Sequence, residues 1–365
     1  MKKVIISLAV CLILACCNNR VNVHKEYMTF DEIISISSFP TLLTLKTSGL
    51  QSVDIPDFYI RNFEIYDSLL FVDTNNESGF LDIISVGSMK SYGRYLNKGK
   101  AKGEFPYGVN LTLQTTFTCS DDSVFAFMYN QVSGHMFRLN VTRTILEKKA
   151  SITEMDFGVS LPHSAFWAKI LRDTVLIMRN VDEIETRQNR TVFTNLGITE
   201  PRSVQRLNDF EIPLNEDFNI MSSLVSVSPT GNRIAEALIG MNYINVYSLD
   251  GEVQYTVCVG NELDKLSDIL ATSKYNRKYM FADLRTFNFG FAVLKYDITE
   301  HVFQSGEYYT PSILFFDWSG NPLGEVKSEI KFNHFDYDEF NNMLYVLDSE
   351  GTLRRCCFTL GHLNK

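Results

Sequence analysis

The chain alternates short polar turns with runs of aliphatic and aromatic residues. Each turn is centred on Asp, Asn or Gly, and a strand-like apolar run follows it. Successive turns lie about 51 to 58 residues apart, a period typical of propeller blades. The pattern occurs at residues 67–73, 122–127, 173–178, 230–235, 289–294 and 341–347. It predicts six similar structural units.

Tight hairpin turns follow most of these runs. Asp250-Gly251 and Ser319-Gly320 each separate two apolar segments, and Gly351 closes a similar turn. Such turns need positive φ, which Gly and Asp tolerate, so they are strong hairpin signals. Each unit is therefore predicted to be an up-and-down antiparallel sheet. Six sheets arranged radially make an all-β, six-bladed β-propeller, whereas a β-sandwich would show shorter spacing.

Three segments depart from the strand pattern. Residues 261–271 place leucines and an isoleucine at helical spacing behind Asn261, which predicts a short helical insertion capped by that residue. Residues 180–208 are polar and charged, which predicts a long inter-strand loop or an irregular blade. Residues 39–50 are expected to supply the outer strand that closes the ring against the last blade.

The N-terminus has the features of a lipoprotein signal. Two lysines precede a short apolar run that ends at Ala15-Cys16, and this ending resembles the bacterial lipobox. The prediction is a signal peptide at 1–15, a thiol at Cys16 that accepts a diacylglycerol, a lipidated tether at 16–38 and a single propeller domain at 39–365. The alternatives are an ordinary cleaved signal or a lipid on Cys17. Several acyl chains would hold such a protein stably on a membrane.

The balance of charged residues and the number of cysteines limit the classes of partner and scaffold that this chain suits. The chain has 34 basic and 43 acidic residues, and removing the two signal lysines leaves a net charge of about −11. This balance gives no electrostatic footprint for nucleic acid, so no nucleic-acid partner is expected. The cysteines that follow the signal are too few and scattered for a disulfide scaffold. The expected location is the cell envelope, at the outer membrane, with the periplasmic face favoured because no acidic run follows Cys16.

Residues 97–109 contain a glycine-spaced loop that carries a family resemblance. Gly99, Gly103, Glu104 and Phe105 are similar to the blade-linking loop of NHL-type propellers. The Gly-Glu-Phe ending resembles that of TolB-like six-bladed propeller lipoproteins of Gram-negative gut bacteria. This resemblance implies the fold and the envelope location, together with a role as a binding platform. Physically, Phe105 is expected to pack between adjacent sheets.

Few residues suggest catalysis, ligand binding or covalent modification. The histidines are isolated, and no nucleophile elbow, P-loop or dinucleotide fingerprint is present. One acidic patch, Asp336, Asp338 and Glu339, is a candidate for channel-mouth contacts, with a solvated hairpin as the alternative. Another pattern, Asp followed by Ser or Thr and an aliphatic residue, predicts O-glycosylation at Ser68, Ser123 and Thr174. The alternative is that these residues simply suit turns.

Two functions remain open at this stage, besides a purely structural role in the envelope. The first is a lipid-anchored, non-catalytic platform for a protein, peptide or glycan partner. The second is a metal-dependent hydrolase similar to six-bladed lactonases, with carboxylates such as Asp156, Glu236 or Asp336 converging in the channel. No cofactor is predicted for the first function, and the second would require a divalent cation in the channel.

Overall fold

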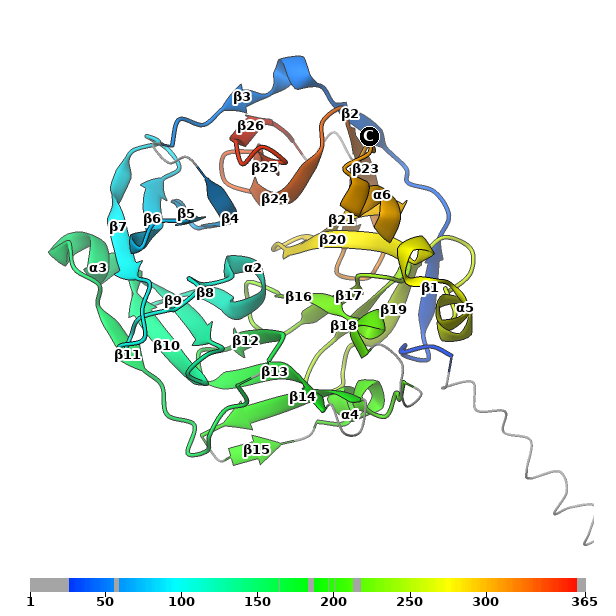
Figure 1. Cartoon of the computed structure of the whole chain (residues 1–365), viewed down its shortest axis with the longest axis horizontal. Coiled ribbons are helices and arrows are strands. Elements are labelled where there is room, and N and C mark those ends of the chain that lie inside the picture. Colours follow the sequence, from blue (N-terminus) through cyan, green and yellow to red (C-terminus); the bar gives the residue numbers. More distant parts are fainter. Residues whose placement is uncertain are drawn as a thin grey trace, which may run out of the picture.

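The chain folds as six sheets of antiparallel strands arranged around a central axis, and two of these sheets add a parallel fifth strand (Figure 1). This computed structural model describes residues 26–55, 59–163, 165–182, 187–195, 197–199, 201–212 and 218–359. In each sheet the strands run outward from the axis in chain order, except that in three sheets the outermost strand comes from the N-terminal segment. The prediction of an all-β, six-bladed propeller is therefore confirmed.

The first three blades contain four strands each. Blade 1 holds β4 (Ile60–Tyr66), β5 (Leu69–Thr74), β6 (Ser78–Ser85) and β7 (Ser91–Asn97). Blade 2 holds β8 (Thr115–Ser120), β9 (Ser123–Asn130), β10 (His135–Asn140) and β11 (Ile152–Glu154). Blade 3 holds β12 (Trp167–Leu171), β13 (Val175–Asp182), β14 (Arg187–Thr194) and β15 (Gly197–Thr199).

The last three blades each gain an outer strand from the N-terminal segment. Blade 4 holds β16 (Ser223–Val227), β17 (Ile234–Leu238), β18 (Tyr243–Tyr247), β19 (Gln254–Val259) and β1 (Ile33–Ile36). Blade 5 holds β20 (Lys278–Thr286), β21 (Gly290–Thr299), β22 (Ser312–Asp317), β23 (Pro322–Ser328) and β2 (Leu42–Leu45). Blade 6 holds β24 (Phe332–Asp338), β25 (Met343–Asp348), β26 (Leu353–Cys357) and β3 (Gln51–Ser52).

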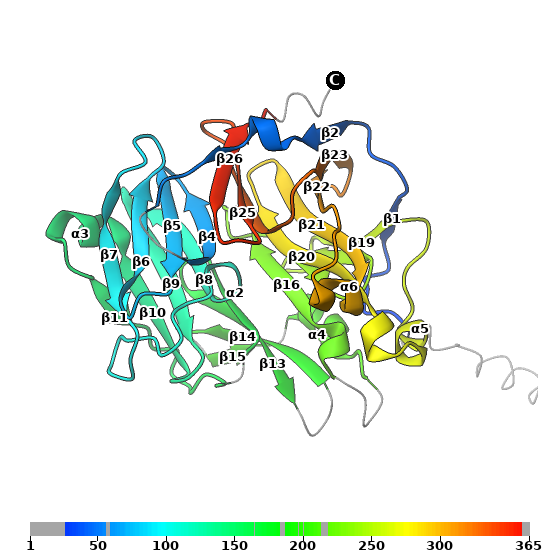
Figure 2. The same ribbon diagram turned by 45° about the horizontal axis from the view of Figure 1, so that its top comes forward.

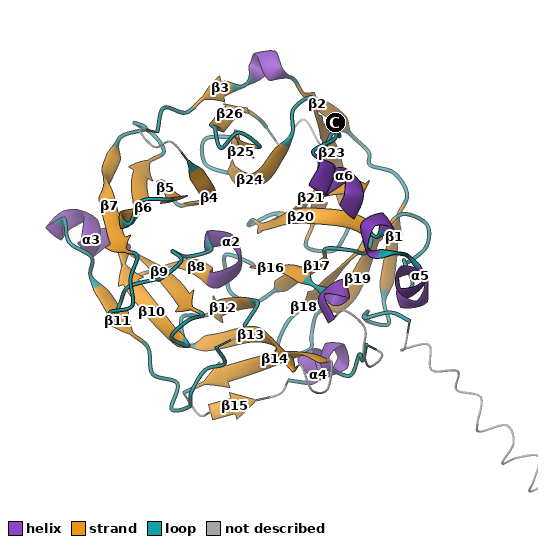
Figure 3. Cartoon of the chain, viewed as in Figure 1, coloured by secondary structure: helices purple, strands orange, loops and turns teal. Residues whose placement is uncertain are grey.

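The propeller has two distinct faces. The six turns predicted from the sequence join the first and second strands of the blades, and we call their side the hairpin face. Asp67, Asp122 and Asp173 have φ of 56°, 57° and 61° there, a conformation that Asp tolerates better than most residues. The opposite side, the helix face, carries α2 (Leu111–Gln114), α4 (Arg202–Asn208), α5 (Leu266–Ala271) and α6 (Glu300–Ser305), drawn in purple in Figure 3. Helix α3 (Val141–Glu147) joins β10 to β11, and the short 3₁₀ helices are η2 (Thr47–Gly49), η3 (Phe218–Met221) and η4 (Lys274–Asn276).

The N-terminal segment runs along the outer edge of three blades (Figure 2). Strands β1 and β2 pair in parallel with β19 and β23, and β3 pairs antiparallel with β26. The prediction that residues 39–50 close the ring on the last blade is therefore wrong. Strand β2 adds to blade 5 instead, and the closing pairs are Ser52 with Arg354 and Gln51 with Arg355.

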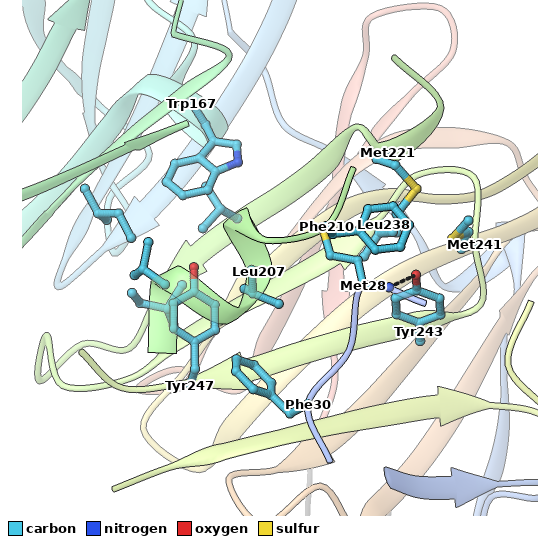
Figure 4. Close-up of a cluster of buried hydrophobic side chains, with 14 of the residues drawn as sticks. Met28, Phe30, Trp167, Leu207, Phe210, Met221, Leu238, Met241, Tyr243 and Tyr247 are labelled. Atoms are coloured by element: carbon cyan, nitrogen blue, oxygen red, sulfur yellow. Dashed lines mark hydrogen bonds between the residues drawn. The ribbon is translucent and has the colours of Figure 1, made fainter. Parts of the chain in front are cut away.

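Residues just before β1 are buried between blades 3 and 4 (Figure 4). Met28 and Phe30 are each 2 % exposed. The backbone N–H of Met28 donates to the Tyr243 hydroxyl at 3.2 Å, and Asn245 donates to the Met28 carbonyl at 2.8 Å. Most of the described part of residues 16–38, the range expected to be a tether, is thus built into the propeller.

The predicted helix begins later than expected. Helix α5 starts at Leu266, after Lys265, and Asn261 does not cap it. Asp264 exchanges two backbone–side-chain hydrogen bonds of 2.9 Å with Asn242, and its carboxylate also pairs with Lys278 at 2.9 Å. These bonds hold the preceding residues in a loop, so only the second half of the segment is helical.

The polar segment 180–208 is not a loop, and its predicted irregularity is wrong. It contains β14, β15 and α4, which complete a regular blade 3. One of the charges that suggested a loop is buried and paired: Arg190 is fully buried and donates to both carboxylate oxygens of Glu236, at 2.6 and 2.8 Å.

The core consists of hydrophobic clusters at the six boundaries between neighbouring blades. Side chains alternate between the two faces of a strand, so each blade contributes to two clusters. On β5, for example, Phe71 packs toward blade 2 whereas Leu70 and Val72 pack toward blade 6. Within the described residues, the four cysteines are free, and no helix has the length and hydropathy to cross a membrane.

Candidate functional site

A cavity of about 560 Å³ occupies the central channel and opens on the hairpin face. All six inner strands line it, and so do the turns that follow five of them. Glu64 comes from blade 1, Lys169 from blade 3 and Arg285 from blade 5. The radial fold thus brings together charged residues that are far apart in the sequence.

Helix α2 lies at the helix-face end of the channel, in the middle of the ring in Figure 1. It contacts the inner strands β4, β8, β12 and β16. Leu111 and Thr112 are buried, and the backbone N–H of Leu111 donates to Asn62 at 3.1 Å. Helix α2 therefore packs against four of the six inner strands at the end of the channel opposite the mouth.

Arg285 forms hydrogen bonds with three elements at the floor of the cavity, the end nearest α2. Its guanidinium donates to the carbonyls of Phe335 and Phe63, both at 2.9 Å, and to Thr112 of α2 at 3.3 Å. It also lies 3.2 Å from a Glu64 oxygen and 3.4 Å from an oxygen of Asp283. Burial alone would lower the Arg285 pKa, but the neighbouring carboxylates outweigh burial and raise it. Arg285 is thus a permanent cation that positions the floor.

Lys169 is the second buried cation of the cavity. It is 4 % exposed, and its ammonium donates to the carbonyl of Thr115 on the neighbouring blade. Burial lowers the pKa of Lys169 to about 8, and the nearby Glu64 carboxylate offsets part of that effect. An ammonium has three donors, and the described structure assigns one of them to Thr115.

Two carboxylates stand near these cations. Asp336 is 4 % exposed and accepts backbone hydrogen bonds from Ile65 at 2.7 Å and Tyr337 at 2.8 Å. Burial raises the pKa of Asp336 to about 7, although Arg285 acts in the opposite direction. Burial also raises the pKa of Glu64, again against Arg285. The cavity therefore holds two groups, Asp336 and Lys169, whose pKa values of about 7 and about 8 lie near neutral pH, a feature concentrated at functional sites.

The walls are rich in hydroxyl and aromatic groups. The Ser226 hydroxyl lies 2.8 Å from that of Thr286, and the Thr118 hydroxyl is buried without a hydrogen-bond partner. The aromatic side chains on the lining are Tyr66, Phe117, Phe287, Tyr337 and Phe340. Six carboxylates and three cations line the cavity, so its formal charge is negative. Such a lining suits a neutral or cationic ligand group with hydrogen-bonding capacity.

The structure places the three predicted channel-mouth residues, Asp336, Asp338 and Glu339, on the cavity lining. Asp338 is 3 % exposed and accepts hydrogen bonds from the backbone of Phe340 and Asn341. Glu339 accepts two hydrogen bonds from Asn288, across to blade 5. The tip of the hairpin is exposed at Phe340 and Asn341, but two of the predicted residues are buried: Asp338 shapes the turn and Asp336 belongs to the floor.

Sequence reasoning missed Glu64, Lys169 and Arg285. A signal for them exists in the sequence, because a polar residue that faces the cavity recurs within each inner strand about every 50 to 60 residues. The six positions are Glu64, Thr116, Lys169, Ser226, Arg285 and Asp336. This period equals that of the turns, so the channel lining could have been found from the same repeat.

The remaining carboxylates expected for a metal site do not reach the cavity. Glu236 lies on the second strand of blade 4, paired with Arg190, and Asp156 follows the outer strand of blade 2. Within the described part of the chain, no three His, Cys, Asp or Glu side chains are grouped so that they could hold a metal ion. The residues described here do not fit the multi-carboxylate metal centre of the second hypothesis.

The glycine-spaced loop connects blade 1 to blade 2. Phe105 is 1 % exposed and packs edge-on against Phe80 and Phe137, with ring centroids 6.0 and 5.5 Å apart. A Cβ at Gly99 would clash with the Glu104 carboxylate, which folds back over this residue. The carboxylate is held there by a hydrogen bond that it accepts from the Ala101 N–H at 3.0 Å. Gly103 has a φ of 82°.

The predicted modification sites occupy equivalent positions in blades 1, 2 and 3. Ser68, Ser123 and Thr174 lie at first hairpin turns, on the same face as the cavity mouth. Ser68 donates to Asp67 at 3.2 Å, and Thr174 donates to the Arg172 carbonyl at 3.2 Å. These bonds suit turns, and O-glycosylation remains a prediction. Cys16 lies outside the described residues.

Comparison with known proteins supports the fold. No family model matches the sequence, and no curated protein matches it. Among solved structures, a member of the DUF4221 family from Bacteroides vulgatus has a TM-score of 0.53 at 12 % identity, covering 85 % of this chain and 95 % of its own. A Bacteroides fragilis "putative exported protein" has a TM-score of 0.47 at 11 % identity, covering 86 % and 88 %. The shared property is the fold.

Proposed function

We propose that this protein is a lipid-anchored envelope protein whose central cavity binds part of a peptide or glycan without chemical turnover. The observation that carries the proposal is the central cavity, which is lined by all six blades and has α2 packed against four of the inner strands at the end opposite its mouth. Pockets of about 300–1,000 Å³ with convergent polar groups are typical of ligand sites.

The anchor and the family are parts of the same proposal. The lipobox-like ending at Cys16 supports lipidation and an envelope location, with the periplasmic side of the outer membrane favoured. The position of Phe105 between blades 1 and 2 is consistent with the linking loop of TolB-like and NHL-like propellers. The exposed turns around the mouth offer room for a larger protein or glycan, of which the cavity would hold one group.

The lining chemistry narrows the ligand. Its hydroxyl groups can exchange hydrogen bonds with sugars or peptide amides, and its aromatic rings can stack on apolar faces. The excess of carboxylates disfavours an anionic ligand. We therefore expect a neutral or cationic group to enter the cavity.

A cavity-filling substitution tests the proposal. Glycan arrays and a displayed peptide library would be probed with the native protein and with Thr118→Trp, whose indole would occupy the cavity. Thr153→Trp, on the exposed outer strand β11, is the matched control. We expect binding that the first substitution abolishes and the second preserves. Absence of binding to either library, or binding that survives Thr118→Trp, would contradict the proposal.

A second function is favoured by one observation. Lys169 and Asp336 have pKa values of about 8 and about 7 within the same cavity, and acid–base catalysis favours groups poised near the working pH. A hydrolase of this kind would turn over a carbonyl or ester substrate in a broad activity screen. Activity lost in Lys169→Met but retained in Thr153→Trp would support catalysis over simple binding.

A further inference from the structure

The described chain begins at the helix face. The carbonyl of Glu26 accepts a hydrogen bond from the Leu266 N–H at 3.1 Å, and its carboxylate accepts one from Ser267 at 3.1 Å. Both donors open helix α5. Because Met28 and Phe30 are buried immediately afterwards, this entry point is held firmly.

The length of the preceding segment limits how the propeller can sit on a membrane. Nine residues, 17–25, lie between Cys16 and Glu26, and the ten steps from one to the other span at most about 35 Å when fully extended. Strand β21 has ten residues and runs from the hairpin face to the helix face, a distance of about 33 Å. The hairpin face could meet the lipid only if the whole segment ran straight along the rim, at a large cost in chain entropy.

The helix face beside this entry point carries exposed aromatic side chains. Tyr275 of η4 is 60 % exposed and Phe303 of α6 is 39 % exposed, and these two elements contact each other. Tyr308, just after α6, is 72 % exposed. Tyrosine and other amphipathic aromatic residues are enriched where proteins meet the membrane–water interface.

Basic residues accompany these aromatic groups. Lys265 precedes α5 and Lys274 begins η4, and both are exposed. Lysine side chains at such a position suit the phosphate groups of lipids, while their stems remain along the protein surface.

We propose that the helix face rests on the lipid surface through Tyr275, Phe303 and Tyr308, so that the cavity mouth points away from the membrane. This inference depends on the lipid anchor at Cys16, which is part of the proposed function. It adds an orientation: the propeller presents its ligand site to the aqueous compartment and uses the opposite face for the membrane.

Fluorescence quenching tests the orientation. The full-length acylated protein would be reconstituted in vesicles of phosphatidylethanolamine and phosphatidylglycerol containing a headgroup nitroxide lipid. Tyr275→Trp and Tyr308→Trp report on the helix face, and Phe340→Trp is the matched reporter on the hairpin face, where Phe340 is 88 % exposed. The signal of the native tryptophans is subtracted. We expect quenching of the two helix-face reporters and none of Phe340→Trp.

Vesicle flotation distinguishes a failure of the lipid anchor from a failure of the proposed orientation. Flotation of the native protein but not of Cys16→Ser would establish the anchor independently of orientation. If the native protein floats but Phe340→Trp is quenched as strongly as the helix-face reporters, or no reporter is quenched, the orientation is overturned and the anchor stands. If the native protein does not float, the anchor fails and the orientation fails with it.

Discussion

The buried ion pair between blades 3 and 4 gives the sharpest stability prediction. Arg190 and Glu236 have no exposed side-chain surface, and their bidentate pair has distances of 2.6 and 2.8 Å. Arg179 lies in the same region, and burial together with Arg190 lowers its pKa to about 9. Glu236→Gln keeps the shape of the side chain but leaves two buried cations without a carboxylate.

The expected loss is large. Removing one partner of a buried pair costs about 3–5 kcal/mol, since the remaining charge is left uncompensated. Glu147→Gln is the control, because it breaks an exposed pair with Arg143 at 2.7 Å that is worth about 0.5 kcal/mol at most. The double change Arg190→Met with Glu236→Leu leaves the net buried charge unchanged and should recover much of the loss.

Equilibrium urea unfolding of the three variants and the native protein at pH 7 measures these effects. The reasoning is refuted if Glu236→Gln costs no more than about 1 kcal/mol beyond the control, far below the cost of an unpaired buried charge. The pH dependence gives a second check. The Arg190 guanidinium outweighs burial and lowers the pKa of Glu236, so its stabilisation is present above the pKa of an unfolded glutamate and is lost as pH falls through the lower folded value.

Three further outcomes are expected. Phe105→Ala should lower the free energy of unfolding by about 3–5 kcal/mol, because it leaves a cavity at the boundary between blades 1 and 2. Tyr107→Ala, which removes a 70 % exposed side chain, should change the free energy of unfolding very little. Thermal and urea unfolding measure both effects. Asp336 has a folded pKa of about 7, above its unfolded value, so native stability should fall relative to Asp336→Asn as pH rises from about 4 to 7; parallel slopes would contradict this. Lys169 has a folded pKa of about 8, below its unfolded value, so native stability should rise relative to Lys169→Met between pH 8 and about 10, as measured by urea titrations across that range.

Much of the fold could be predicted because the blades repeat. The turns at Asp67, Asp122 and Asp173 follow from local chemistry, since positive φ favours these residues, and their spacing gives the blade count. Errors arose where local pattern and tertiary structure disagree. Residues 187–194 look like a loop because they are polar, yet Arg190 is neutralised by a carboxylate distant in the sequence.

The candidate site was harder to predict. Asp336, Asp338 and Glu339 stood out because they lie close together in the sequence. Lys169, in contrast, is the single charge of an apolar strand, and Glu64 shares β4 with Arg61. Their meaning depends on the radial arrangement of the blades, which no local pattern contains. The position of α2 could not be predicted either, since four residues are too few for a periodic signal.

The strand that completes the last blade has a kinetic consequence. Ser52 pairs with Arg354, so the ring cannot close until both ends of the chain are available. Contacts of such long sequence separation form late and slowly, because loop entropy must be overcome first. A chain that emerges N-terminus first would hold the edges of β1, β2 and β3 unpaired until blades 4 to 6 had been made. Completion of the native ring therefore waits until blade 6 has been made, and the strand edges that stay unpaired until then are where protection by a chaperone would matter most.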